Sequence, residues 1–249
     1  MTHTQIDTLT SWLDEARSAV FFGGAGVSTA SGIPDFRSAA GLYASQGRGG
    51  RSPEYMLSHE CLMNEPAEFF TFHRQNLVHP DAQPNRAHTG LAELERQARM
   101  TAVVTQNIDG LHQKAGSQVV HELHGSVQRY YCLGRGHHQF TLEQIPDSPV
   151  VPICPDCGAM IRPDVVLYGE MLDDDVVDAA VTAVRQADVL LVGGTSLNVY
   201  PAAGLLHYYR GDRLALVNLT ETPMDYQADL VIHSPIDEVI GQVCDRLFV

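Results

Sequence analysis

The segment FFGGAGVSTASGIPDFRS, residues 21–38, combines an apolar run with a glycine-rich turn. Phe21 and Phe22 end an apolar run, and Gly23-Gly24-Ala25-Gly26 follows at once, as when a buried strand enters a tight turn. Small residues let backbone N–H groups approach a pyrophosphate, and the start of a following helix favours its negative charge. The third glycine of a complete dinucleotide fingerprint is missing, so a plain tight turn explains these four residues nearly as well.

Near its end the same segment has three contrasting side chains, Asp35-Phe36-Arg37, directly after Pro34. Arg37 has the charge to pair with a phosphate, and Phe36 has a ring that could cover a nucleotide. A surface turn with one buried phenylalanine is the simpler interpretation of such a triplet taken alone. These residues alone are compatible with both a nucleotide-binding loop and an ordinary turn.

Short apolar runs recur outward from this segment, with helical patterns between them. Because the runs do not alternate with polar residues, they are typical of parallel strands covered on both faces. Alternating strands and helices predict a doubly wound, Rossmann-like α/β domain with about six parallel strands. The expected strands are Ala19–Phe22, Thr101–Thr105, Val119–His121, Val189–Val192, Leu214–Asn218 and Leu230–His233. The expected helices are Ala87–Arg99, Asp173–Gln186 and Pro235–Leu247.

Two regions break this alternation and divide the chain. Residues 38–84 are rich in Gly, Phe, His and Pro and contain no clear strand, so we expect an irregular, partly helical insertion. Residues 130–163 hold three cysteines and several prolines, and we expect a small zinc-ribbon-like module there. The Rossmann-like domain then consists of residues 1–37, 85–129 and 164–249.

Composition limits the class of protein. The chain has 249 residues, of which 44% are hydrophobic, which is enough for a sizeable core. A net charge of −14 argues against nucleic acid as a partner, since phosphate contacts need clustered Lys and Arg. An odd number of cysteines, five, does not indicate a disulfide framework. With no apolar run of about 20 residues and no signal-peptide pattern, we expect a cytoplasmic protein without membrane contact.

Polar side chains gather where two of the expected strands end. Gln106, Asn107 and Asp109 follow the strand that ends at Thr105, and His124 closes the next apolar segment. The carboxyl ends of parallel strands form the ligand crevice of such a sheet. Imidazole titrates near neutrality, which suits a general base. Because the chain has twelve histidines, the assignment of His124 depends on its neighbours.

Six motifs together resemble the sirtuins, the NAD-dependent protein-lysine deacylases, and in particular their short bacterial members. They cover essentially the whole chain in the family's order. The motifs are GAGVSTASGIPDFR, TQNIDGLHQKAGS, HELHG, RPDVVLYGE, GGTSLNVYPAAGL and VNLTETPMD. The resemblance implies a deacetylase that uses NAD: nicotinamide leaves, the acyl oxygen attacks the ribose, and free lysine and acetyl-ADP-ribose are produced.

The resemblance also implies roles for individual residues. His124 would be the general base, and Asn107 would position a water or a ribose hydroxyl. Val165 and Val166 would line the acyl-lysine tunnel, and the substrate peptide would add as a strand between residues 169–170 and 197–199. The cofactor-binding residues implied in this way are Ala25, Thr29, Phe36, Arg37, Gln106, Ile108, Asp109, His124, Thr195, Ser196 and Asn218.

A metal site is expected in the small module. CPDC, residues 154–157, is a C-x-x-C knuckle, and the family supplies a second cysteine pair to complete tetrahedral zinc. Here Cys132 is followed by Arg135, which cannot bind zinc, so we take His137 as the fourth ligand, with His138 as the alternative. The expected ligands are Cys132, Cys154, Cys157 and His137. A module held by packing alone, without metal, is the competing interpretation.

Other activities are compatible with the same motifs. Protein mono-ADP-ribosyl transfer, NAD hydrolysis and non-catalytic nucleotide sensing are the alternatives. The presence of Asn107 and His124 disfavours a sensor, and the peptide-contacting motif GGTSLNVYP disfavours a hydrolase. Phe70 and His73 stand where relatives that prefer acidic acyl groups carry Tyr and Arg, so the resemblance implies an uncharged acyl group. We expect a monomer that acts on acyl-lysine proteins or peptides.

Overall fold

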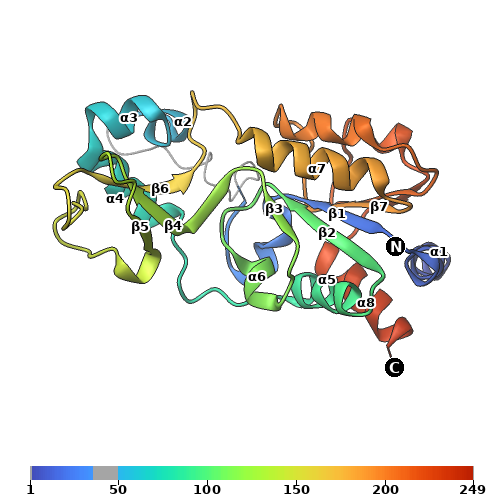
Figure 1. The fold of residues 1–249 in the computed structure, drawn as a ribbon. Coiled ribbons are helices and arrows are strands. Elements are labelled where there is room, and N and C mark those ends of the chain that lie inside the picture. Colours follow the sequence, from blue (N-terminus) through green and yellow to red (C-terminus); the bar gives the residue numbers. More distant parts are fainter. Residues whose placement is uncertain (1, 36–49, 249) are drawn as a thin grey trace.

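The computed structural model describes residues 2–35 and 50–248, arranged as shown in Figure 1. A six-stranded sheet has the order β3-β2-β1-β7-β8-β9, and every pairing in it is parallel. Its strands are β1 (Ala19–Gly23), β2 (Met100–Thr105), β3 (Val120–Glu122), β7 (Leu190–Gly193), β8 (Leu214–Val217) and β9 (Leu230–Ile232). The predicted Rossmann-like α/β fold with six parallel strands is confirmed.

Helices cover both faces of this sheet (Figure 1). On one face α1 (His3–Glu15), α5 (Arg86–Arg96) and α8 (Ile236–Leu247) pack with Phe21 in a single apolar core. On the other, α7 (Asp174–Gln186) and the 3₁₀ helix Ala202–Tyr208 pack with Phe22. Successive strand residues therefore point into opposite cores, which explains why the strands are apolar without alternation.

Helix ends follow local signals. α7 begins after Asp173, whose side chain accepts a hydrogen bond from the Val176 N–H, and two further acids occupy its first turn. α5 ends at Arg96, three residues before the end that the sequence predicts. The chain reverses there because Ala98 adopts a φ of +56°, which no helix can continue.

Apart from α6 (Leu111–Ala115), which packs against α5, a smaller lobe completes the described fold (Figure 1). Three short helices, α2 (Pro53–Met56), α3 (His59–Asn64) and α4 (Pro66–Asn76), make the insertion partly helical, as predicted. A separate antiparallel sheet has the order β5-β4-β6. Its strands are β4 (Gly125–Cys132), β5 (Gln139–Thr141) and β6 (Ile161–Val165). Because this sheet extends beyond residues 130–163 at both ends, the division of the chain into domains stays a prediction.

Within the described residues, no helix combines the length and apolarity that crossing a membrane requires.

Candidate active site

The strand order of the large sheet reverses between β1 and β7, and ligands of open parallel sheets bind at the carboxyl ends beside such a reversal. Here the two loops that follow these strands touch backbone to backbone. The Gly26 N–H donates to the Gly194 carbonyl at 2.8 Å. A Cβ on Gly26 would lie 2.8 Å from that same oxygen, and Gly194 has a φ of +59°, so both positions require glycine.

The loop after β1 continues as two short 3₁₀ turns, Ala25–Val27 and Thr29–Ser31, and not as an α-helix. Ala25 is half-buried, and Thr29 is exposed with its hydroxyl donating to the Gly26 carbonyl at 3.0 Å. The other two cofactor residues expected from this stretch, Phe36 and Arg37, lie outside the described residues.

Gln106, directly after β2, connects three parts of the crevice. Its backbone N–H donates to the Gly23 carbonyl at 3.0 Å. Its side-chain amide donates to Thr195 Oγ1 at 3.2 Å, across the reversal point. Its carbonyl lies 3.0 Å from Nδ1 of His124. One residue therefore links the ends of β1 and β2 to the loops after β3 and β7.

The contact with Gln106 fixes the tautomer of His124. A carbonyl oxygen can only accept, so Nδ1 carries the hydrogen, and Nε2 of the neutral ring keeps its lone pair. Burial lowers the pKa of His124, and the hydrogen bond to the Gln106 carbonyl offsets part of this shift. The carbonyl of His124 accepts the Val166 N–H at 3.0 Å, which joins this residue to the end of β6.

A second set of side chains, here called the Ser28 network, lies deeper in the crevice. The Ser28 hydroxyl donates to Asp109 Oδ2 at 2.7 Å and accepts from Asn107 Nδ2 at 3.1 Å. His88 Nε2 lies 3.4 Å from the same hydroxyl. Because Nδ1 of His88 accepts the Asn85 N–H at 3.3 Å, the ring proton is on Nε2, which donates to Ser28. Every polar atom at the centre of this network is thus satisfied.

Three of the described histidines, the buried histidines, are neutral and almost fully enclosed by the protein. They are His73, His88 and His112. Burial lowers their pKa values to about 4, about 4 and about 3, respectively. The His88 and His112 rings lie 4.8 Å apart between their centroids.

Of the Ser28 network, the sequence identified Asn107 and Asp109 but missed Ser28 and His88. Ser28 lies in a run of small residues, and 60 positions separate it from His88. The one local signal is that Ser28 follows the glycine turn directly.

The other predicted cofactor residues lie around the same crevice. Ser196 follows Thr195 in the loop after β7. Asn218 follows β8, where its side-chain amide donates to the Thr220 carbonyl at 2.9 Å. Ile108 packs against the apolar core of the smaller lobe, which also contains Val165. Ile108 therefore connects the crevice to the apolar core at the end of β6.

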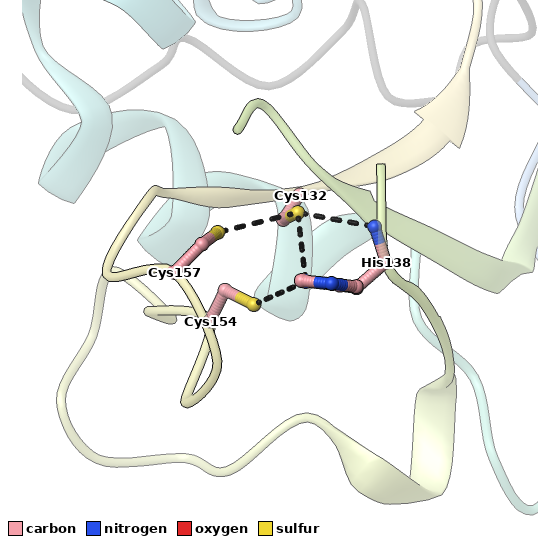
Figure 2. Close-up of side chains that lie close together, drawn as sticks. All are labelled: Cys132, His138, Cys154 and Cys157. Carbon is pink, nitrogen blue, oxygen red and sulfur yellow. Dashed lines mark hydrogen bonds between the residues drawn. The ribbon is translucent and has the colours of Figure 1, made fainter. Parts of the chain in front are cut away.

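Four ligand atoms converge in the smaller lobe, as Figure 2 shows. Sγ of Cys132 lies 3.7 Å from Sγ of Cys157 and 3.7 Å from Nδ1 of His138, which is 3.2 Å from Sγ of Cys154. All four atoms lie within 4.8 Å of one another. Tetrahedral zinc, with bonds of about 2.3 Å to sulfur and about 2.0 Å to nitrogen, separates its ligand atoms by about 3.5–3.8 Å. The residues present fit zinc.

The histidine of this cluster is His138, and the prediction of His137 was wrong. His137 is exposed and has a φ of +41°, at the end of a turn closed by its N–H and the Gly134 carbonyl. After this turn the chain runs back along β4, and the Cys132 N–H donates to the His138 carbonyl at 2.9 Å. The register of that pairing brings the His138 side chain, and not its neighbour's, to Cys132.

The fold and the crevice define a class first: a dinucleotide-binding α/β protein with an added Cys₃His module. Comparisons then define the family. The model of the Sir2 family matches residues 24–201. An NAD-dependent protein deacetylase of Cutibacterium acnes is 55% identical over 95% of this chain and 96% of its own length. The chain belongs to the Sir2 family.

Solved structures agree with this assignment. A structure described as Sir2 with a p53 peptide and NAD⁺ has a TM-score of 0.83 and 39% identity, over 97% of this chain and 98% of that one. A structure described as Sir2 bound to acetylated peptide has a TM-score of 0.83 and 37% identity, with the same coverage.

Proposed function

We propose that this chain is an NAD-dependent protein-lysine deacetylase, which moves the acetyl group of a modified lysine to ADP-ribose and releases nicotinamide. Family membership and the activity named for the relatives support this function. The observation that carries it is the placement of His124 between two regions. Its ring contacts Gln106 in the crevice, while its carbonyl holds Val166, where the acyl-lysine is expected.

In this proposal the crevice holds NAD. The glycines at the ends of β1 and β7 give the pyrophosphate close access to backbone N–H groups. The Ser28 network forms the nicotinamide side, with Asn107 and Asp109 held in fixed rotamers by one shared hydroxyl. Ala25, Thr29, Thr195, Ser196 and Asn218 complete the cofactor contacts. When bound, NAD supplies the ribose carbon that accepts the acetyl oxygen as nicotinamide leaves.

His124 supplies the general base. Nε2 of its neutral ring takes a proton from a ribose hydroxyl, and the Nδ1–H donated to the Gln106 carbonyl stabilises the imidazolium that forms. Because burial lowers the pKa of His124, the ring is neutral and ready to accept at pH 7. Asn107 orients the reacting hydroxyl or a water.

The substrate enters from the other side of His124. Val165 and Val166 line the acyl-lysine tunnel, and the peptide backbone pairs with residues 169–170 and 197–199 as an added strand. Zinc, when bound to Cys132, His138, Cys154 and Cys157, holds the ends of β4 and the 154–157 knuckle together and takes no part in the chemistry. The cytoplasmic location, the monomeric state and the lack of a nucleic-acid partner stay predictions.

One experiment tests the function directly. The chain is incubated with NAD and an acetyl-lysine peptide, and nicotinamide, deacetylated peptide and acetyl-ADP-ribose are quantified by mass spectrometry. We expect the three products in equal amounts. Nicotinamide release that does not depend on peptide would indicate an NAD hydrolase, and ADP-ribose attached to protein would indicate a transferase. Either result in place of acetyl-ADP-ribose would contradict the proposal.

A further inference from the structure

A buried ion pair lies beside residues 165–170, which comprise the last residue of β6 and the turn after it and are here called the receiving segment. Arg162 in β6 is only 4% exposed. Its Nη1 donates to Glu170 Oε1 at 2.5 Å and its Nη2 to Glu170 Oε2 at 3.0 Å. This bidentate geometry is the strongest that an arginine and a carboxylate can form. No step of the proposed reaction uses the side chain of either residue, so the ion pair needs another explanation.

The other donors of Arg162 bind the backbone of the same stretch of chain. Nε donates to the Pro163 carbonyl at 3.1 Å, and Nη2 also donates to the Val165 carbonyl at 2.7 Å. The guanidinium lies over the ring of Tyr131, 5.6 Å from its centroid. A buried guanidinium is costly unless its donors are satisfied. Here the two terminal nitrogens bind Val165 at the start of the receiving segment and Glu170 at its end, which fixes the distance between them.

Glu170 is held from further directions. Its Oε2 accepts the Leu167 N–H at 2.9 Å, and its Oε1 lies 2.8 Å from Nδ1 of His59 in α3. Burial by itself would raise the pKa of Glu170, but the hydrogen bonds from Arg162, the Leu167 N–H and His59 lower it to about 2. The carboxylate therefore stays ionised at every pH at which the protein would work.

Backbone contacts support the receiving segment on its outer side. The Tyr168 N–H donates to the Leu57 carbonyl at 3.1 Å, and the His59 N–H donates to the Tyr168 carbonyl at 3.0 Å. These bonds make a parallel bridge between Ser58 and Tyr168. The segment is thus attached to α3 on one side, to Arg162 on another, and to His124 through Val166.

We propose that Arg162 and Glu170 are positioning residues that shape the receiving segment before the substrate peptide arrives, and that His59 extends this support into α3. The inference rests on the proposed function, because it requires the peptide to pair with this segment. Strand addition is weakened when the receiving backbone must first become ordered. Breaking the ion pair should therefore reduce affinity for the peptide and leave the NAD crevice intact.

The variant Glu170→Gln tests this role, since it keeps the shape of the side chain and removes its charge. We expect the KM for an acetyl-lysine peptide to rise about tenfold, as for a lost charged hydrogen bond. The Kd for NAD and kcat at saturating peptide should stay unchanged. Arg162→Lys should behave in the same way, because lysine cannot form the two-pronged contact. The control Asp245→Asn breaks the exposed pair with Arg86 between α5 and α8 and should change none of these quantities.

A peptide KM that is unchanged in Glu170→Gln would overturn the inference. So would a parallel loss of NAD affinity, which indicates general destabilisation. Amide hydrogen exchange gives a readout that does not depend on activity: residues 165–170 should exchange faster in Glu170→Gln than in the native chain. If the native chain transfers no acetyl group, the proposed function fails, and this exchange measurement still decides whether the ion pair orders the segment. Unchanged protection would refute the role.

Discussion

Replacing Ser28 with alanine removes the hydroxyl at the centre of the Ser28 network. Ser28 is only 1% exposed, and its hydroxyl contacts Asp109, Asn107 and His88. Without it, Asn107 Nδ2 and His88 Nε2 become buried donors that lose this partner, and Asp109 loses the 2.7 Å bond. The replacement leaves the glycine turn and the sheet untouched, so its effect reports on the network itself.

The size of the effect follows from these contacts. A buried polar group that loses its partner costs about 1–3 kcal/mol, and the contact to His88 is long, so the free energy of unfolding should fall by about 2–4 kcal/mol. For a chain of this size, each kcal/mol lowers the melting temperature by about 2–4 °C, which gives about 5–15 °C in total. With Asn107 and Asp109 no longer held, kcat/KM for NAD should drop at least about tenfold.

Ser117→Ala is the matched control. Ser117 is also buried, at 4% exposure, but its hydroxyl has no hydrogen-bond partner among the described residues. Alanine there should therefore leave stability unchanged or slightly improved. Urea unfolding of the two variants gives the comparison. A Ser28→Ala chain that is no less stable than Ser117→Ala, and that keeps native kinetics with NAD, would refute the assigned network.

Three further predictions concern histidines. The buried histidines have folded-state pKa values below the unfolded value of 6.5, so the unfolded chain binds more protons and stability rises with pH. As the pH falls from 6.5 to about 4, each of these histidines should lower the free energy of unfolding by up to about 1.4 kcal/mol per pH unit. Urea unfolding measured across this pH range tests the prediction, and a free energy of unfolding that does not change with pH would contradict it. His124→Tyr should abolish acetyl-ADP-ribose formation with an unchanged circular dichroism spectrum, and retained turnover would exclude His124 as the base. His138→Ala should lose zinc in native mass spectrometry while His137→Ala keeps it; the reverse would restore His137 as a ligand.

The large sheet was predictable because its strands are buried on both faces. β1, β7 and β8 are each an almost uninterrupted apolar run, and each of their ends lies within one residue of the predicted end. The insertion was harder because its helices are short. α2 has four residues and α3 has six, too few for an apolar stripe to repeat, although Ser52 and Ser58 cap their starts.

The position of a crevice residue could be predicted where that residue closely follows a strand. Gln106, Asn107 and Asp109 lie within four residues after β2, and His124 comes two residues after β3, so the topology of a parallel sheet brings them to one edge. The Ser28 network could not be predicted in full, since its connection to His88 exists only once α5 packs on the sheet.

The fourth metal ligand and the ion pair could not be predicted from the sequence for a different reason. The choice between His137 and His138 depends on a single positive φ angle in the turn before β5, which a sequence does not reveal. The contact between Arg162 and Glu170 depends on the chain turning back after β6. In both cases the sequence shows which residue types are present. Which of them meet in space depends on the local backbone conformation.

The central claim is that the crevice between β1 and β7 presents an NAD ribose to His124. A crystal structure of the chain grown with NAD and an acetyl-lysine peptide measures this most directly. The account predicts the pyrophosphate against Gly24, Gly26 and Gly194, with Nε2 of His124 in hydrogen-bond contact with a hydroxyl of the ribose that carries nicotinamide. A dinucleotide bound elsewhere, or an imidazole whose Nε2 points away from that sugar, would contradict it.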